Sequence, residues 1–224
     1  MAHPFSLAFA LNVAALVQQL RRERHGVHER AEAAITLSRE QGFTFYEALG
    51  TIQRGWALVA QGQHVAGLEQ IRQGLAAYRA TGSAVALPYY LALLVEAYAT
   101  GGQVAEGLRV LAEAVALVHT HGERDYQAEL YRLKGELLLA QGGPRHQWRE
   151  AEQCFHYAIE IAHRQQAKSL ELRAAMSLAR LWQQGKRAEA YDLLAPIYSW
   201  FTEGFDTADL KDAKALLHEL EDGR

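Results

Sequence analysis

Proline, cysteine and the β-branched residues are scarce in this chain. Its 224 residues include four prolines and one cysteine, Cys154. A lone cysteine excludes an internal disulfide, fits a reducing compartment, and is interpreted as a small core residue rather than a nucleophile. The abundant residues are Ala, Leu, Gln, Glu and Arg, which lose little side-chain entropy in a helix. These absences predict an all-α protein.

Charge of one sign and long apolar runs are also missing. The net charge is −3 with acids and bases interleaved, and half of the residues are hydrophobic. Such a chain folds, but it has no one-signed field to attract nucleic acid or an anionic membrane. The longest central stretch without a charge, 83–95, is shorter than the ~20 residues that cross a bilayer. Arg21, Arg22 and Arg24 follow the apolar N-terminal run, whereas a signal peptide begins with basic residues. We expect a soluble, cytoplasmic protein.

Motifs for chemistry are absent as well. The sequence has no GxxxxGK[ST] phosphate loop, and its ten histidines include no HExxH pair and no cysteine cluster. Glu129 and Glu136 stand seven apart on one helical face, a possible acid and base pair, but a solvated or partner-facing acidic stripe is favoured. The sequence therefore predicts no catalytic residue, no metal and no cofactor.

What the chain does have is a glycine at every twentieth residue. The glycines in this register are Gly42, Gly62, Gly82, Gly102, Gly122 and Gly142. Between them, apolar residues recur at spacings of three and four, the period of a helix with one buried stripe. A glycine just past a helix closes the last turn in the left-handed conformation. A forty-residue period of helix and turn predicts antiparallel hairpins stacked into a right-handed α-solenoid.

The pattern predicts eleven helices in one domain, 1–224. The expected helices are 4–24, 28–41, 44–61, 64–81, 87–101, 104–121, 124–141, 147–166, 169–184, 187–203 and 207–221. They pair into five hairpins, at 4–41, 44–81, 83–121, 124–166 and 169–203. The last helix, 207–221, is expected to be a capping helix.

Three local features refine these boundaries. Pro196 lies inside a predicted helix and predicts a kink or an early end. The extra residues 143–147 break the forty-residue register and predict a longer loop. Asp206 or Thr207 is expected to cap the final helix.

The spacing within the hairpins matches the tetratricopeptide repeat (TPR), in which small residues of two paired helices pack together around a turn glycine. Gly55, Gly62, Gly67 and Ile71 fit this spacing. Glycine in a helix interior is ~1 kcal/mol less favourable than alanine, so it needs a compensating contact. The mid-helix glycines are Gly55, Gly67, Gly107 and Gly135. At these positions we expect close approach of paired helices.

Three longer stretches resemble one particular group of repeat proteins. They are "AELYRLKGELLLAQGG" (128–143), "EAEQCFHYAIEIAHRQQAKSLELRAAMSLARLW" (150–182) and "YSWFTEGFDTADLKDAKALL" (198–217). They resemble the C-terminal TPR region of large bacterial signalling ATPases, many identified as adenylate or guanylate cyclases. The resemblance implies a sensing or partner-binding arm.

The inner, concave face of the hairpins is the expected binding surface. Counting along the TPR pattern places these residues on it: Ile52, Trp56, Val59, Tyr89, Leu93, Glu96, Glu129, Arg132, Glu136, Met176, Ala179 and Trp182. Aromatic residues beside arginine dominate the binding energy of interfaces. The alternative is that Trp56 and Trp182 merely fill space between helices.

The leading hypothesis is therefore a non-catalytic scaffold that binds a protein or peptide segment in this groove. A small-molecule-sensing regulatory domain is the second hypothesis. A hydrolytic enzyme on an α-solenoid is the least supported. The sequence leaves the partner and the oligomeric state open.

Overall fold

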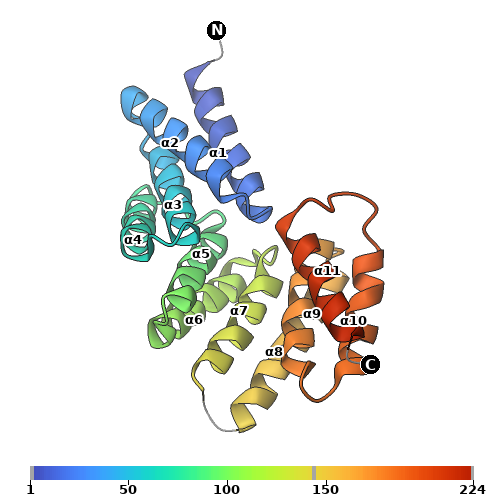
Figure 1. Cartoon of the computed structure of the whole chain (residues 1–224). Coiled ribbons are helices and arrows are strands. Elements are labelled where there is room, and N and C mark those ends of the chain that lie inside the picture. Colours follow the sequence, from blue (N-terminus) through green and yellow to red (C-terminus); the bar gives the residue numbers. More distant parts are fainter. Residues whose placement is uncertain (1–2, 143–144, 223–224) are drawn as a thin grey trace. The chain divides into compact units, whose positions relative to one another are not determined.

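The computed structural model describes residues 3–142 and 145–222, and every regular element in these ranges is an α-helix (Figure 1). The helices are α1 (Pro4–Leu20), α2 (Arg24–Gln41), α3 (Thr44–Ala60), α4 (His64–Ala80), α5 (Leu87–Thr100), α6 (Val104–His121), α7 (Gln127–Ala140), α8 (Arg145–Arg164), α9 (Lys168–Trp182), α10 (Arg187–Ser199) and α11 (Ala208–Glu221). The prediction of an all-α chain is confirmed over the described residues.

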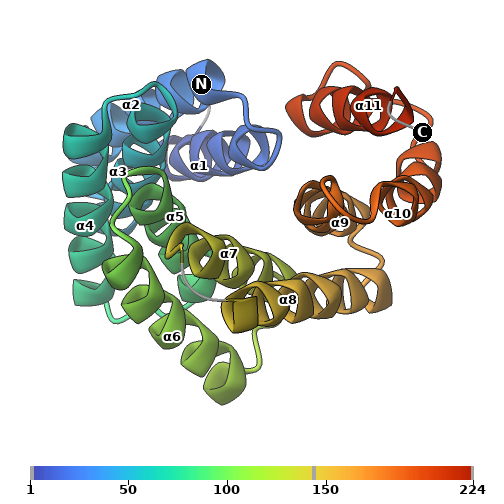
Figure 2. The same cartoon turned by 60° about the horizontal axis from the view of Figure 1, so that its bottom comes forward.

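The chain divides into two compact units, 1–110 and 111–224, and the division falls inside α6. In the first unit, helices α1 to α5 pack in chain order, and α3 also contacts α1 and α5. In the second unit, α7 to α11 pack in chain order, and α9 also contacts α7 and α11 (Figure 2). Each unit is a stack of helical hairpins in which alternate helices touch. That the two units form one domain stays a prediction.

The six glycines of the twenty-residue register all adopt the left-handed conformation, with φ between 65° and 87°. A Cβ atom at any of them would meet nothing within 4 Å, so the backbone conformation and not a lack of space requires glycine. After three of these glycines, the next residue donates its amide to a carbonyl five residues back: Phe43 to Ser38, Gln63 to Leu58 and Gln103 to Tyr98. This bond closes the helix end.

The same turn also occurs where the sequence has no glycine. Arg22 (φ 61°) and Gln166 (φ 56°) adopt the left-handed conformation, and the residues after them make the same five-residue bonds. The prediction of an unbroken helix over 4–24 is therefore wrong. α1 ends at Leu20 and α2 begins at Arg24, because Arg22 forms the turn that glycine forms elsewhere.

Other boundaries also differ from the prediction. α7 begins at Gln127 and not at 124, and α10 runs through Pro196 but ends at Ser199 and not at 203. The predicted loop 143–147 lies partly outside the described residues, and α8 begins at Arg145. Thr207 is the residue before α11, but its hydroxyl donates to the Gly204 carbonyl (2.7 Å) and does not cap the helix.

Close approach of α3 and α4 is confirmed at two of the mid-helix glycines. A Cβ on Gly55 would lie 2.7 Å from the Gly67 carbonyl oxygen, and one on Gly67 would lie 2.6 Å from the Gly55 oxygen. At Gly135 the space is filled instead by the Phe155 ring, 2.4 Å from a Cβ position. These glycines let helices or rings approach to a distance that a methyl group would prevent.

The final helix packs on α9 and α10 of the second unit. Its buried stripe is Leu210, Ala213, Leu216 and Leu220, in contact with Leu172, Met176, Ala190 and Leu194. Beside this stripe, the Arg173 guanidinium donates to the buried Asp209 carboxylate, with Nε and Oδ2 2.7 Å apart. An apolar face and an ion pair together fix α11 on α9.

Replacing Gly67 with alanine should destabilise the fold. The added methyl group must push α3 away from α4, and overpacking of this kind lowers the free energy of unfolding by about 1–3 kcal/mol, opposed by the better helix propensity of alanine. Gly185→Ala is the matched control, since Gly185 has open space and no positive φ. Urea denaturation of both variants measures the difference, and equal midpoints would contradict the close-approach explanation.

Replacing Gln166 with glycine should stabilise the fold by about 1 kcal/mol, because glycine adopts φ 56° without the clash of a Cβ atom. The neighbouring residue Gln165 does not have a left-handed backbone, so the Gln165→Gly variant relieves no strain and should not be more stable than the parent. Thermal melting followed by circular dichroism compares the two variants. A Gln166→Gly protein that melts below the parent would show that this turn is not strained.

Candidate binding site

The predicted groove residues of the first unit lie on α3 and α5, and most are buried. The buried ones are Ile52, Trp56, Val59, Tyr89 and Leu93. The Trp56 indole donates to the Glu96 carboxylate (3.0 Å), and the Tyr89 hydroxyl donates to Gln19 (2.8 Å). These side chains fill the space between helices, which was the alternative for Trp56. That a partner binds over them stays a prediction.

The predicted groove residues of α7 form one polar cluster. Arg132 makes two bonds to Glu129, at 2.7 and 3.0 Å, and a third contact to Glu136 at 3.3 Å. Ser177 on α9 donates to the same Glu136 carboxylate at 2.6 Å. The structure therefore brings all three predicted charges together and adds a serine that the sequence did not single out.

This cluster is satisfied within the unit. Burial alone would lower the pKa of the Arg132 guanidinium, but the carboxylates of Glu129 and Glu136 outweigh it and raise the pKa above its ordinary value. The two carboxylates therefore favour the charged form of Arg132. Because its donors already contact carboxylates, the cluster joins α7 to α9 and is a weaker candidate for binding an external group.

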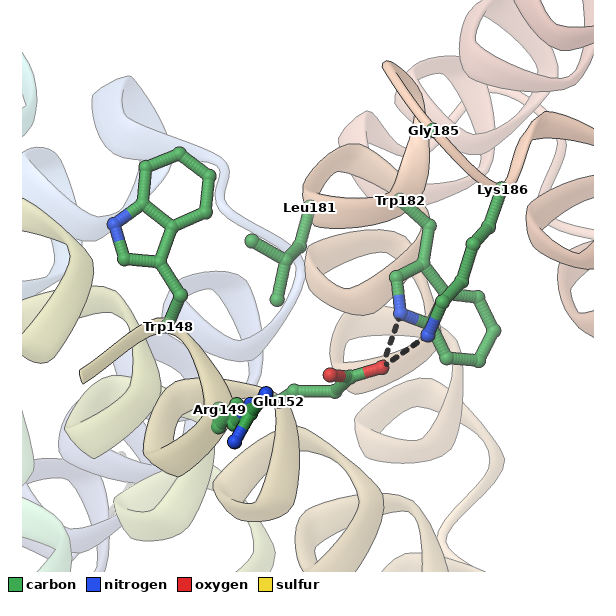
Figure 3. Close-up of a pocket in the computed structure, with 7 residues that line it drawn as sticks. All are labelled: Trp148, Arg149, Glu152, Leu181, Trp182, Gly185 and Lys186. Atoms are coloured by element: carbon green, nitrogen blue, oxygen red, sulfur yellow. Dashed lines mark hydrogen bonds and ion pairs between the residues drawn. The ribbon is translucent and has the colours of Figure 1, made fainter. Parts of the chain in front are cut away.

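An open site with largely apolar walls lies between α8 and the end of α9 (Figure 3). It is a pocket of about 190 Å³ within the second unit. Its lining residues are Trp148, Arg149, Glu152, Leu181, Trp182, Gly185 and Lys186, and we call it the tryptophan pocket. Trp182 is the one predicted groove residue in it, whereas Met176 and Ala179, earlier on α9, are buried.

Hydrogen bonds fix one wall of the tryptophan pocket. Glu152 Oε1 accepts from the Trp182 indole at 2.6 Å and from the Lys186 ammonium at 2.9 Å, as Figure 3 shows. Lys186 also lies 4.8 Å from the centre of the Trp182 ring, within the range of a cation–π contact. Trp148 stands on the other side and is 53% exposed. One tryptophan is thus fixed and the other faces solvent.

The sequence pattern missed most of this pocket. Counting along the inner helices selects α9, but Trp148, Arg149 and Glu152 belong to α8 and Lys186 to the following turn. The one signal in the sequence that could have indicated the pocket is Trp148, a second tryptophan on the helix before α9. Only the packing of α8 against α9 shows that Glu152 joins Trp182 to Lys186.

The described residues offer no metal-binding cluster, and the one cysteine is part of the core. Over residues 3–142 and 145–222, no group of three or more His, Cys, Asp or Glu side chains is placed to hold a metal ion. Burial raises the pKa of the Cys154 thiol, which packs with Phe155 and Leu178 in the core. Within the described residues, the helices are too short or too polar for a membrane span.

Comparison with known proteins connects the chain to TPR-like repeats. No protein-family model matches the chain. An uncharacterized protein of Rhizobium meliloti (strain 1021) is 25% identical over 181 residues, 81% of this chain and 17% of that protein. Two crystal structures show nearly identical TPR-like repeats of a Podosopora anserina protein assigned as a kinesin light chain. They have TM-scores of 0.59 and 0.58 and 21% identity, and they cover 89% of this chain and 96% of theirs. The fold is therefore an α-solenoid of TPR-like hairpins.

Acidification should release the fixed wall of the tryptophan pocket. Partial burial alone would raise the pKa of the Glu152 carboxyl, but the hydrogen bonds from Lys186 and Trp182 outweigh it and lower the pKa. A lowered folded-state pKa means that the stabilisation is complete above 4.5, the ordinary value, and is lost as the pH falls below it. The Trp182 indole NH resonance should shift with a midpoint below 4.5, and the Glu152→Gln variant should lack this transition. A midpoint above 4.5 would contradict the assignment.

Proposed function

We propose that the chain is a non-catalytic scaffold that binds a segment of another protein, and that an apolar side chain of this segment enters the tryptophan pocket. One observation carries the proposal: a half-exposed tryptophan, Trp148, faces a pocket whose opposite wall, Trp182, is already fixed by hydrogen bonds. A preordered wall lowers the entropy lost on binding.

The size and chemistry of the pocket favour a protein side chain. About 190 Å³ suits one large apolar group, and tryptophan is among the residues that most often dominate binding energy. The rim carries Arg149 and Lys186 against a single carboxylate, Glu152. This excess of positive charge favours a partner segment with an acidic residue next to the apolar one.

The wider role that we propose is that of an interaction arm in a larger bacterial signalling protein. The resemblance of 128–143, 150–182 and 198–217 to the TPR region of signalling ATPases supports this role. The relative from Rhizobium meliloti is much longer than this chain, which covers 17% of it. Such an arm would act in the cytoplasm by bringing a partner to the modules that perform chemistry.

The Trp148→Ala variant tests the proposed binding site. Partners captured from cell extract by the parent protein are identified, and one purified partner is titrated against the parent and the variant. Truncating an aromatic anchor should weaken binding by about 2 kcal/mol, roughly thirtyfold. Because Trp148 is exposed, its loss should leave the melting temperature unchanged.

The matched control is Trp200→Ala, since Trp200 is also exposed and also belongs to the second unit but lies outside the pocket. It should bind the partner as the parent does. The Lys186→Glu variant reverses one positive charge at the rim of the pocket. It should therefore bind an acidic segment more weakly than the parent does. Equal binding by the parent and Trp148→Ala would show that the partner uses another surface.

A further inference from the structure

The first unit contains a second pocket, of about 200 Å³, between α1, α3 and the start of α5. It is lined by Phe9, Asn12, Val13, Leu16, Phe45, Tyr46, Leu49, Gln53, Tyr78, Val85, Ala86 and Tyr90, and we call it the aromatic pocket. Five of its residues are aromatic. Rings from four helices, α1, α3, α4 and α5, therefore surround a space large enough for a one- or two-ring molecule.

Two buried amides in this lining, Asn12 and Gln53, have atoms without hydrogen-bond partners. Gln53 is 1% exposed, and neither its Nε2 nor its Oε1 atom has a partner among the described residues. Asn12 is 3% exposed; its Nδ2 donates to the Ala8 carbonyl at 3.0 Å, but its Oδ1 is unpaired. An unpaired buried polar group destabilises a fold by about 1–3 kcal/mol, so three such atoms at one pocket require an explanation.

The charge of the lining limits what can bind. No Asp, Glu, Lys, Arg or His side chain is among the lining residues. Burial raises the pKa of the Tyr90 hydroxyl well above its ordinary value, so this side chain also stays neutral. A charged ligand would lose its hydration without gaining a counter-charge. The aromatic pocket is suited to a neutral molecule.

The rim of the pocket is fixed by Tyr78. Its hydroxyl donates to the Val85 carbonyl and lies 2.9 Å from the Ser83 hydroxyl. Next to Val85, Ala86 adopts φ 55°, a left-handed backbone that is unfavourable for alanine. Strained residues of this kind cluster at ligand sites, where the surrounding structure maintains them.

We propose that the aromatic pocket binds a small, neutral, flat nitrogen heterocycle that carries a hydrogen-bond donor next to an acceptor. The ring faces of such a molecule stack on the aromatic walls. The Gln53 amide offers one donor and one acceptor side by side, which is how glutamine recognises the edge of an adenine ring. The Asn12 oxygen accepts a second ligand N–H. This ligand would form a hydrogen bond with each of the three unpaired atoms, Gln53 Nε2, Gln53 Oε1 and Asn12 Oδ1. The chain would then have a small-molecule site separate from the tryptophan pocket.

Adenine is the probe, measured by isothermal titration calorimetry on the full chain. The parent should bind it, and Gln53→Leu should weaken binding by about tenfold to a hundredfold, because the leucine leaves the adenine edge unpaired. Gln53→Leu should itself melt at or above the parent temperature, since it removes two unpaired buried atoms. Val13→Trp, at an exposed lining position, should block the pocket without disturbing the fold.

Gln73→Leu is the control, since Gln73 lies on the surface of α4 and donates to Glu69. It should bind adenine as the parent does. Naphthalene, which has the ring faces without the polar edge, should bind at least tenfold more weakly than adenine. Absence of adenine binding by the parent would overturn the proposal, and so would equal binding by Gln53→Leu or Val13→Trp.

Discussion

The left-handed turn at the end of helices α1 to α8 is the constraint on which the rest of this structure depends. A left-handed residue after the helix lets the next amide return to a carbonyl five residues back, and the chain then reverses direction. Six glycines at twenty-residue spacing have this left-handed conformation, and so do Arg22 and Gln166. Because the turns recur at a fixed interval, neighbouring helices have similar lengths and their apolar stripes meet.

The residues at the contact then decide how closely two paired helices approach each other. Between α3 and α4 the contact is made through glycines, with backbone against backbone at Gly55 and Gly67. Between α7 and α8 the Phe155 ring fills the space over Gly135. The same repeat spacing therefore supports two kinds of contact, because a glycine can admit either a neighbouring backbone or a large ring.

The two units use their inner helices differently. In the first unit, five aromatic residues on α1, α3, α4 and α5 surround a neutral pocket that also contains unpaired amide atoms. In the second unit, the corresponding positions of α7 and α9 carry a closed network of Arg132, Glu129, Glu136 and Ser177. The charged network is closed, so we assign the protein segment to the tryptophan pocket of the second unit and the small molecule to the neutral pocket of the first.

The sequence alone determined the helical class, the spacing of the turns and the close approach at Gly55 and Gly67, because these follow from backbone conformation and from the period of apolar residues. It also selected the charges that meet on α7. It did not distinguish Arg22 from an interior helical residue, since arginine carries no turn signal. Tertiary structure decided which side chains are buried. Trp56 and Gln53 lie on the same helix three residues apart, and only packing against α1 and α5 shows that one pairs with Glu96 while the other is left unpaired in a pocket. The hydrogen-bond partners of a side chain depend on neighbouring helices far away in sequence, and the helical period contains no information about them.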